Sequence, residues 1–225
     1  MIKRILNASK KQKIIGLLVI ITTLVGILTI VTQAYKDKNK GMISSETESN
    51  VLEVPSINLI PPNKIDVNNK EEFDVDVVLS SLPSNIYPAA SISIYFDKDK
   101  LEFTRVKKGT MQAYGDKSSN GKDFSVPYWE YDTEASNMNG QINTMYLDKT
   151  AGRFAYNKDG FDNKSKNVVI RLGFKLKEGV KPGETYPLNI KDVVFATING
   201  DKDNTSLSSS RNTLKINDCE LVVQD

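Results

Sequence analysis

The 225-residue sequence contains no histidine and a single cysteine, Cys219. Without histidine, the chain can form no serine-histidine triad, no imidazole acid-base pair and no histidine-containing zinc site. With one cysteine, it can form neither an intramolecular disulfide nor a thiolate zinc cluster. These two absences exclude a large part of catalytic and metal-binding chemistry.

Charge is missing from a run near the amino terminus, residues 14–31, and the next charged residue is Lys36. As an α-helix, this run would span about 27 Å, close to the hydrocarbon thickness of a bilayer. Basic residues precede the run and acidic residues do not, which favours a cytoplasmic amino terminus. We therefore expect a basic cytoplasmic segment at 1–13, a transmembrane signal anchor at 14–34, and an extracellular remainder of a single-pass cell-membrane protein.

A cleaved signal peptide is the alternative interpretation of the same run. Thr32 and Ala34 offer acceptable side chains before a cleavage point. The apolar run is longer than the roughly 7 to 15 residues of most signal peptides, which favours the uncleaved anchor. Both interpretations export the domain, so the alternative is a secreted protein cleaved near Ala34.

The net charge of +2 divides unevenly along the chain. Residues 1–40 carry eight basic and one acidic residue, and residues 41–225 carry 22 basic and 27 acidic residues. The mildly acidic second part gives no support to nucleic-acid binding. Residues 35–50 are polar and almost free of large apolar groups, which is typical of a flexible tether, so we expect the folded domain at 51–225.

Alternating apolar and polar residues dominate the predicted domain, and no stretch after residue 40 has a convincing helical period. Asn-Gly and Pro-Gly pairs between the alternating stretches indicate turns. This pattern predicts an all-β protein, an antiparallel β-sandwich. The expected strands are 57–60, 73–79, 91–96, 101–106, 124–131, 141–147, 168–176, 185–190, 193–198 and 214–223.

Residues 95–103 read YFDKDKLEF and are followed by Val106 and Gly109. They resemble the YDPxxLExxxVxxG signature of cohesin domains, the receptor modules of cellulosomal scaffoldins that bind dockerins. Further stretches resemble the family in the same order, so that the resemblance covers roughly residues 56–223. These stretches are 62–83, 142–156, 158–160 (KDG), 168–177 and 193–204.

The resemblance implies a nine-stranded jelly-roll β-sandwich with no catalytic activity, no cofactor and no metal. In cohesins, the sheet that contains the third, fifth, sixth and eighth strands receives the dockerin helices. The resemblance therefore implies a partner-binding site on this sheet. Its expected residues are Ala89, Ser91, Ser93, Tyr95, Tyr128, Trp129, Tyr131, Tyr146, Lys149 and Gly152.

Three of these positions depart from the family pattern. Type I cohesins commonly present Asn and Asp near Ala89 and Ser91, and an acidic residue near Lys149. Here the polar pair is replaced by smaller groups and the charge is reversed. Because a reversed charge at an interface selects against the wrong partner, the sequence favours a divergent dockerin over a standard type I dockerin.

Individual residues retain alternative interpretations. Trp129 and its tyrosine neighbours fill the core in one interpretation and contact a partner in the other, while Tyr95 and Tyr146 are the better candidates for an exposed face. Residues 199–204 are rich in oxygen ligands, but Ser206 and Asn212 stand where an EF-hand loop counted from Asp201 needs Gly and Glu. We therefore expect a polar turn, and a calcium site of another type is the alternative.

We therefore expect a non-catalytic cell-surface module that docks a dockerin-bearing protein, such as a polysaccharide-degrading enzyme. Two other functions are consistent with a sandwich. Direct carbohydrate binding predicts that Trp129 and nearby tyrosines lie coplanar on an exposed face. A structural envelope protein predicts an exposed apolar patch without an aromatic row.

The anchor can be tested by intact-mass spectrometry of the protein isolated from its native host. We expect the mass of a chain that retains residues 14–34. A mass corresponding to a chain that begins at Tyr35 would show cleavage and contradict the anchor.

Overall fold

The computed structural model describes residues 53–68, 70–114, 124–125, 127–149, 154–162, 166–197 and 205–225. The predicted cytoplasmic segment, anchor and tether lie outside these residues, as do the 199–204 turn and Gly152. Within the described ranges, no helix has the length and apolar character needed to cross a membrane.

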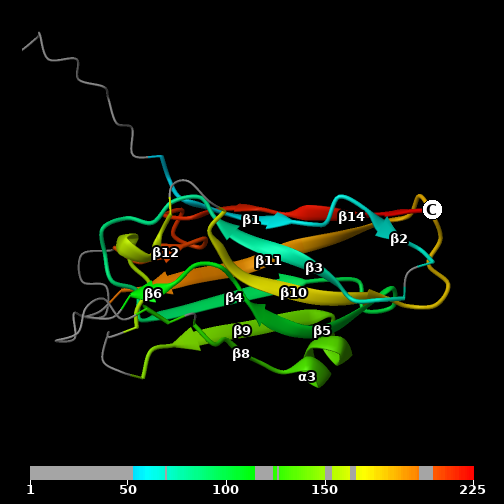
Figure 1. The fold of residues 1–225 in the computed structure, drawn as a ribbon, viewed down its shortest axis with the longest axis horizontal. Helices are drawn as coiled ribbons and strands as arrows, with labels where there is room; N and C mark the ends of the chain where they lie inside the picture. Colours follow the sequence, from blue (N-terminus) through cyan, green and yellow to red (C-terminus); the bar gives the residue numbers. More distant parts are fainter. Residues whose placement is uncertain are drawn as a thin grey trace, which may run out of the picture. The chain divides into compact units, whose positions relative to one another are not determined.

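Two sheets form the domain (Figure 1). All neighbouring strands in the first sheet, which we call the back sheet, are antiparallel except β1 and β13, which run parallel. In spatial order, the back sheet contains β13 (Lys215–Asn217), β1 (Ser56–Ile60), β3 (Phe73–Leu79), β10 (Val168–Leu176) and β5 (Leu101–Lys108).

The second sheet, which we call the front sheet, holds the long strand β11 near its middle. Its strands in order are β2 (Ile65–Asp66), β14 (Cys219–Gln224), β11 (Thr185–Ala196), β4 (Ala89–Tyr95), β9 (Gln141–Leu147) and β8 (Glu130–Tyr131), with β12 (Leu207–Ser208) paired to β11. The remaining elements are the hairpin of β6 (Ala113–Tyr114) and β7 (Phe124–Ser125), the helix α3 (Thr133–Asn139) and the 3-10 turn η1 (Lys158–Gly160).

The alternation of apolar and polar residues explains why these segments form strands. On β4, for example, Ile92 and Ile94 point inward and are almost fully buried, while Ser91 and Tyr95 point outward. Each fully buried large apolar side chain contributes about 1.5 to 3 kcal/mol to folding. The all-β sandwich predicted from the sequence is confirmed.

Aromatic side chains fill the space between the sheets in two groups. Rings in the first group meet edge to face, with centroids 5.6 and 5.8 Å apart for Phe96 and Phe103 against Phe174. The second group lies at the opposite end of β4. Its members are Tyr87, Trp129, Tyr146, Tyr156 and Phe195.

The described residues contain fourteen strands instead of the nine implied by the family resemblance, and eight of them have five or more residues. The others are pieces of two or three residues. The predicted strand 124–131 is interrupted because Pro127, which has no N–H to donate to a ladder, lies between β7 and β8.

Two other predicted boundaries also differ. Segments 185–190 and 193–196 belong to one strand, β11, whose register shifts between Ile190 and Asp192, and the predicted end at Ile198 lies outside the described residues. The last predicted strand is divided into β13 and β14 at Asp218, whose carboxylate accepts a hydrogen bond from the Ile190 N–H at 2.7 Å.

The helix α3 was not predicted from the sequence. Its ends are capped locally: Asp132 accepts a hydrogen bond from the Ala135 N–H, and Gly140 adopts a left-handed conformation with φ of 66°. The Asn139-Gly140 pair therefore ends a helix instead of turning a hairpin. With seven residues, α3 is too short to show a helical period.

Asn137 ties α3 to the edge of the back sheet. Its side-chain amide donates to the Phe103 carbonyl at 2.7 Å and accepts from the Phe103 N–H at 2.9 Å. The amide thus replaces a neighbouring strand at this point of β5. An edge covered in this way offers fewer free backbone groups to another chain.

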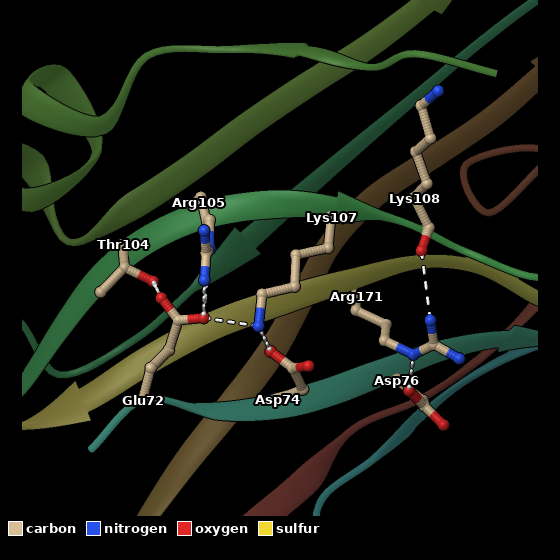
Figure 2. Close-up of polar contacts among 8 residues, drawn as sticks. All are labelled: Glu72, Asp74, Asp76, Thr104, Arg105, Lys107, Lys108 and Arg171. Carbon is tan, nitrogen blue, oxygen red and sulfur yellow. Dashed lines mark hydrogen bonds and ion pairs between the residues drawn. The ribbon is translucent and has the colours of Figure 1, made fainter. Parts of the chain in front are cut away.

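The outer surface of the back sheet carries a network of ion pairs (Figure 2). Glu72, just before β3, accepts hydrogen bonds from Thr104 at 2.5 Å and from Arg105 Nη2 at 2.9 Å. Lys107 lies 2.5 Å from Glu72 and 2.8 Å from Asp74. Burial alone would raise the pKa of Glu72, but the bonds from Lys107, Thr104 and Arg105 outweigh it and lower the pKa to about 2.

The same surface continues along β3 and β10. Asp76 accepts a hydrogen bond from Arg171 Nε at 3.1 Å and pairs with Lys166 at 3.2 Å. Arg171 also donates to the carbonyl of Lys108 at 3.2 Å (Figure 2). Gly173 leaves the space that Glu72 occupies, because a Cβ there would lie 2.9 Å from the Glu72 carboxyl carbon.

We predict that Glu72→Gln lowers the free energy of unfolding by about 1.5 to 3 kcal/mol at neutral pH, because it weakens charge-assisted hydrogen bonds. The folded-state pKa of about 2 lies below the ordinary 4.5, so Glu72 stabilises the fold fully above about pH 5 and loses this effect as the pH falls toward 2. Urea unfolding at several pH values measures both effects.

Glu178→Gln is the matched control, since Glu178 is exposed in the turn after β10. We expect it to change stability by less than about 0.5 kcal/mol. Equal stability of the Glu72→Gln variant and the wild type at pH 7 would contradict the assigned role.

Candidate functional site

The outward side chains of four adjacent strands of the front sheet form one continuous surface, which we call the front face. Strand pairing places these side chains in rows across the sheet. The rows are Leu147, Ala89 and Ala196; Glu130, Met145, Ser91 and Val194; Asn143, Ser93 and Asp192; and Gln141, Tyr95 and Asn189.

The first two rows make an apolar half. Leu147 lies opposite Ala89, and Met145 lies opposite Ser91. Leu147 and Met145 are 52% and 48% exposed, so two large apolar side chains that are two positions apart on β9 are both open to solvent. Adjacent exposed apolar residues of this kind are typical of interaction surfaces.

The last two rows make a polar half. Asn143 accepts hydrogen bonds from Ser93 and Gln141, both at 2.8 Å. The Lys191 ammonium lies 5.0 Å from the centroid of the Tyr95 ring, within the range of a cation–π contact. The polar half therefore has hydrogen-bonding groups whose positions are fixed by their neighbours.

The outward side chains of β4 are smaller than those of its neighbour β9. Ala89, Ser91 and Ser93 are small, whereas Met145 and Leu147 on β9 are large. The exposed apolar surface of this half is therefore concentrated on β9.

Charge is scarce on the front face, and Glu130 and Asp192 each accept a hydrogen bond. Glu130 accepts a hydrogen bond from Lys149 at 3.3 Å, and Asp192 accepts one from the Ser209 hydroxyl at 2.7 Å. Depletion of charge with exposed Met and Tyr is the composition of an interface core. Within the described ranges, no group of three or more acidic or cysteine side chains could hold a metal.

The four expected site residues on β4 lie on this surface. Ser91 and Tyr95 are exposed, and Ala89 and Ser93 are partly exposed. Two other aromatic site candidates have exposed surface. Tyr128 is 66% exposed at the edge beside β8, and Tyr131 is half-buried and packs against Phe103.

Trp129 does not lie on any exposed face. Its side chain is 2% exposed, and its indole N–H donates to the Tyr156 hydroxyl at 3.0 Å. Burial raises the pKa of Tyr156 well above its ordinary value. Trp129 therefore fills the core, which is the first of its two interpretations, and the coplanar exposed row that direct carbohydrate binding predicts is not formed with this side chain.

Tyr146 is also buried, contrary to the expectation of an exposed side chain. It shares the inward side of β9 with Ile142, and burial raises its pKa to about 12. The exposed neighbours Met145 and Leu147 were not identified from the sequence, although the alternation of β9 places them outward. Lys149 is exposed and paired with Glu130.

Solved structures with a similar fold are cohesin modules. The third cohesin of ScaC in complex with the ScaB dockerin, from Acetivibrio cellulolyticus, is 13% identical and has a TM-score of 0.52; the matched region covers 76% of this chain and 99% of that one. The Coh-OlpA module in complex with Doc918, from Clostridium thermocellum, is 16% identical with a TM-score of 0.51 and the same two coverages.

A third similar structure is the sixth cohesin of scaffoldin B from Acetivibrio cellulolyticus, in complex with a Cel5 dockerin mutant. It is 17% identical with a TM-score of 0.50, and the match covers 75% of this chain and 99% of that one. No protein-family model matches the sequence, and no curated protein matches it. The domain therefore has the cohesin fold, as the sequence motifs predicted, in a divergent form.

We predict that Trp129→Phe lowers the free energy of unfolding by about 1 to 3 kcal/mol, because it leaves a cavity and removes the hydrogen bond to Tyr156. Tyr128→Phe, at an exposed neighbour, should change stability by less than about 0.5 kcal/mol. Denaturant unfolding of both variants compares them directly. A Trp129→Phe variant as stable as the wild type would contradict the core position of this side chain.

Proposed function

We propose that this chain, which has the cohesin fold, is a non-catalytic binding module that docks a dockerin-bearing protein through its front face. The observation that carries the proposal is the exposed apolar half of that face, centred on Met145 and Leu147. The similar solved structures include cohesins in complex with dockerins, which supports the same class of partner for this chain.

The mechanism is equilibrium association. In such interfaces, a few well-packed apolar or aromatic side chains contribute most of the binding free energy, and the surrounding polar groups exclude water and fix orientation. The front face has both parts: Met145 and Leu147 on one half, and Asn143, Ser93 and Tyr95 on the other.

The chemistry of the face favours a divergent dockerin. Ala89 and Ser91 replace the Asn and Asp that type I cohesins commonly present, and they leave space above β4 for larger side chains of the partner. Lys149 at the edge reverses the usual acidic charge. A partner with apolar residues over β4 fits this surface better than one that relies on hydrogen bonds to Asn and Asp.

We further propose that docking takes place at the cell surface and recruits polysaccharide-degrading enzymes. The basic residues before the predicted anchor at 14–34 support a cytoplasmic amino terminus and an extracellular domain. The polar residues 35–50 would separate the domain from the membrane.

The two alternative functions fare differently. Direct carbohydrate binding required Trp129 on an exposed face, and this side chain is buried. A structural envelope role predicts an exposed apolar patch without an aromatic row, and Met145 and Leu147 form such a patch, so this observation is shared with docking. Binding measurements with dockerins distinguish this role from docking.

The test uses the full-length chain in mild detergent and a panel of purified dockerins, including all those encoded by the same organism. We expect at least one dockerin to bind with micromolar or tighter affinity in isothermal titration calorimetry. Failure of every dockerin to bind would refute the proposed function.

For the dockerin that binds, we predict that Met145→Lys weakens binding by about 100-fold or more, since it places a charge in the centre of the apolar half. Ile216→Lys is the matched control, because Ile216 is a partly exposed apolar residue on β13 of the back sheet. We expect the control to retain wild-type affinity. Equal affinities of the two variants would place the docking surface elsewhere.

A further inference from the structure

A shallow depression of about 280 Å³ lies at the edge of the front face, beside β8 and the end of β9. Tyr128 and Leu147 contribute to its walls, and Pro127, Tyr146 and Phe154 are among the other apolar side chains that line it. Leu147 also belongs to the first row of the front face, so the depression and the front face form one surface.

The apolar lining is held in place by the core beneath it. The Tyr146 hydroxyl donates to the Phe154 carbonyl, and the Phe154 N–H donates to the Asp148 carboxylate at 3.3 Å. The Tyr146 ring packs against Trp129, with centroids 6.3 Å apart. Because these side chains are already ordered, an incoming group would not have to order them.

Two exposed apolar groups border this ordered lining. Tyr128 is two-thirds exposed and Leu147 is half-exposed, so a group placed between them would remove apolar surface of both from water. Tyrosine is well suited to such a wall, because it provides a large contact area and loses little conformational entropy on binding.

The volume indicates the size of the occupant. Pockets for drug-sized small molecules typically measure about 300 to 1,000 Å³, and this depression lies just below that range. It is of the order of a single large side chain. An amino-acid side chain from a protein bound on the adjoining face therefore fits better than an independent small ligand.

The charges at the rim set the polarity of the occupant. Glu130 and Lys149 are both exposed and pair with each other at 3.3 Å. The Asp148 carboxylate also lines the depression and accepts a hydrogen bond from the Phe154 N–H. Since each of these charges already has a partner within the domain, the depression favours a neutral side chain over a charged one. An exposed pair of this kind is weak, so either partner can turn toward polar groups next to the occupant.

We propose that this depression receives one large apolar side chain, aromatic or branched aliphatic, from the docking segment of the protein bound on the front face. The inference rests on the proposed function and adds the anchor residue that the partner must carry. Partners without such a side chain at this position bind weakly, so the depression is a determinant of specificity.

The first experiment needs no dockerin. N-acetyl-tryptophanamide and N-acetyl-leucinamide are titrated into the full-length chain labelled at the methyl groups of Leu and Met, and the spectra are followed by NMR. We expect saturable shifts of the Leu147 methyl groups and none of Met138, which is 63% exposed on α3. N-acetyl-glutaminamide should shift neither, and Tyr128→Ser should abolish the Leu147 shifts.

The second experiment uses the dockerin that binds. Leu147→Ala and Tyr128→Ala should each weaken binding by about 10-fold or more, while Ile216→Ala, an apolar truncation on the back sheet, leaves the affinity unchanged. An alanine scan of the dockerin should find one apolar residue whose loss is not additive with Leu147→Ala, as expected for groups in contact. Unchanged thermal midpoints establish that the variants are folded.

The outcomes separate the two proposals. If a dockerin binds but Leu147→Ala and Tyr128→Ala retain its full affinity, the anchor is refuted and the docking function stands. If no dockerin binds, the docking function is refuted, and the methyl titration alone decides whether the depression takes an apolar side chain. Shifts of Met138 equal to those of Leu147 would show non-specific association and overturn the anchor.

Discussion

Burial of every second side chain between the two sheets is the interaction on which the rest of the structure depends. On β4, the inward Ile92 and Ile94 fix the strand, and their burial leaves Ser91 and Ser93 on the outside. The inward residues therefore determine which positions lie on the front face. The residue types at these outward positions can vary without changing the core. This separation explains how a sequence only 13 to 17% identical to the three cohesin modules can share their fold.

The same alternation determines what the sequence could predict. It located most strands and the outward residues of β4, because one strand suffices for that inference. On β9 the same alternation places Met145 and Leu147 outward and Tyr146 inward, whereas the family resemblance implied that Tyr146 belongs to the binding site. Neither the neighbours of β4 on β11 nor the helix α3 could be predicted, since the first depend on a register shift near Ile190 and the second on capping by Asp132.

The outer surfaces of the two sheets differ in the number of charged side chains and in how these are paired. On the back sheet, Glu72, Asp74 and Asp76 are paired with basic side chains of the neighbouring strands, so its charges are satisfied within the domain. The front face has few charges and carries exposed apolar groups in their place. The outer surface of the back sheet is therefore polar and largely ion-paired, whereas the front face exposes apolar groups whose burial would be favourable.

The parallel pairing of β1 with β13 has a mechanical consequence. The next two strands are also parallel, since β2 pairs with the last strand, β14. A force that pulls the two ends of the domain apart enters through β1 and β14, and it slides the strands of these parallel pairs along each other. Their backbone hydrogen bonds are then loaded together in shear and cannot be opened one at a time. A domain connected in this way resists extension between its ends until several bonds fail at once.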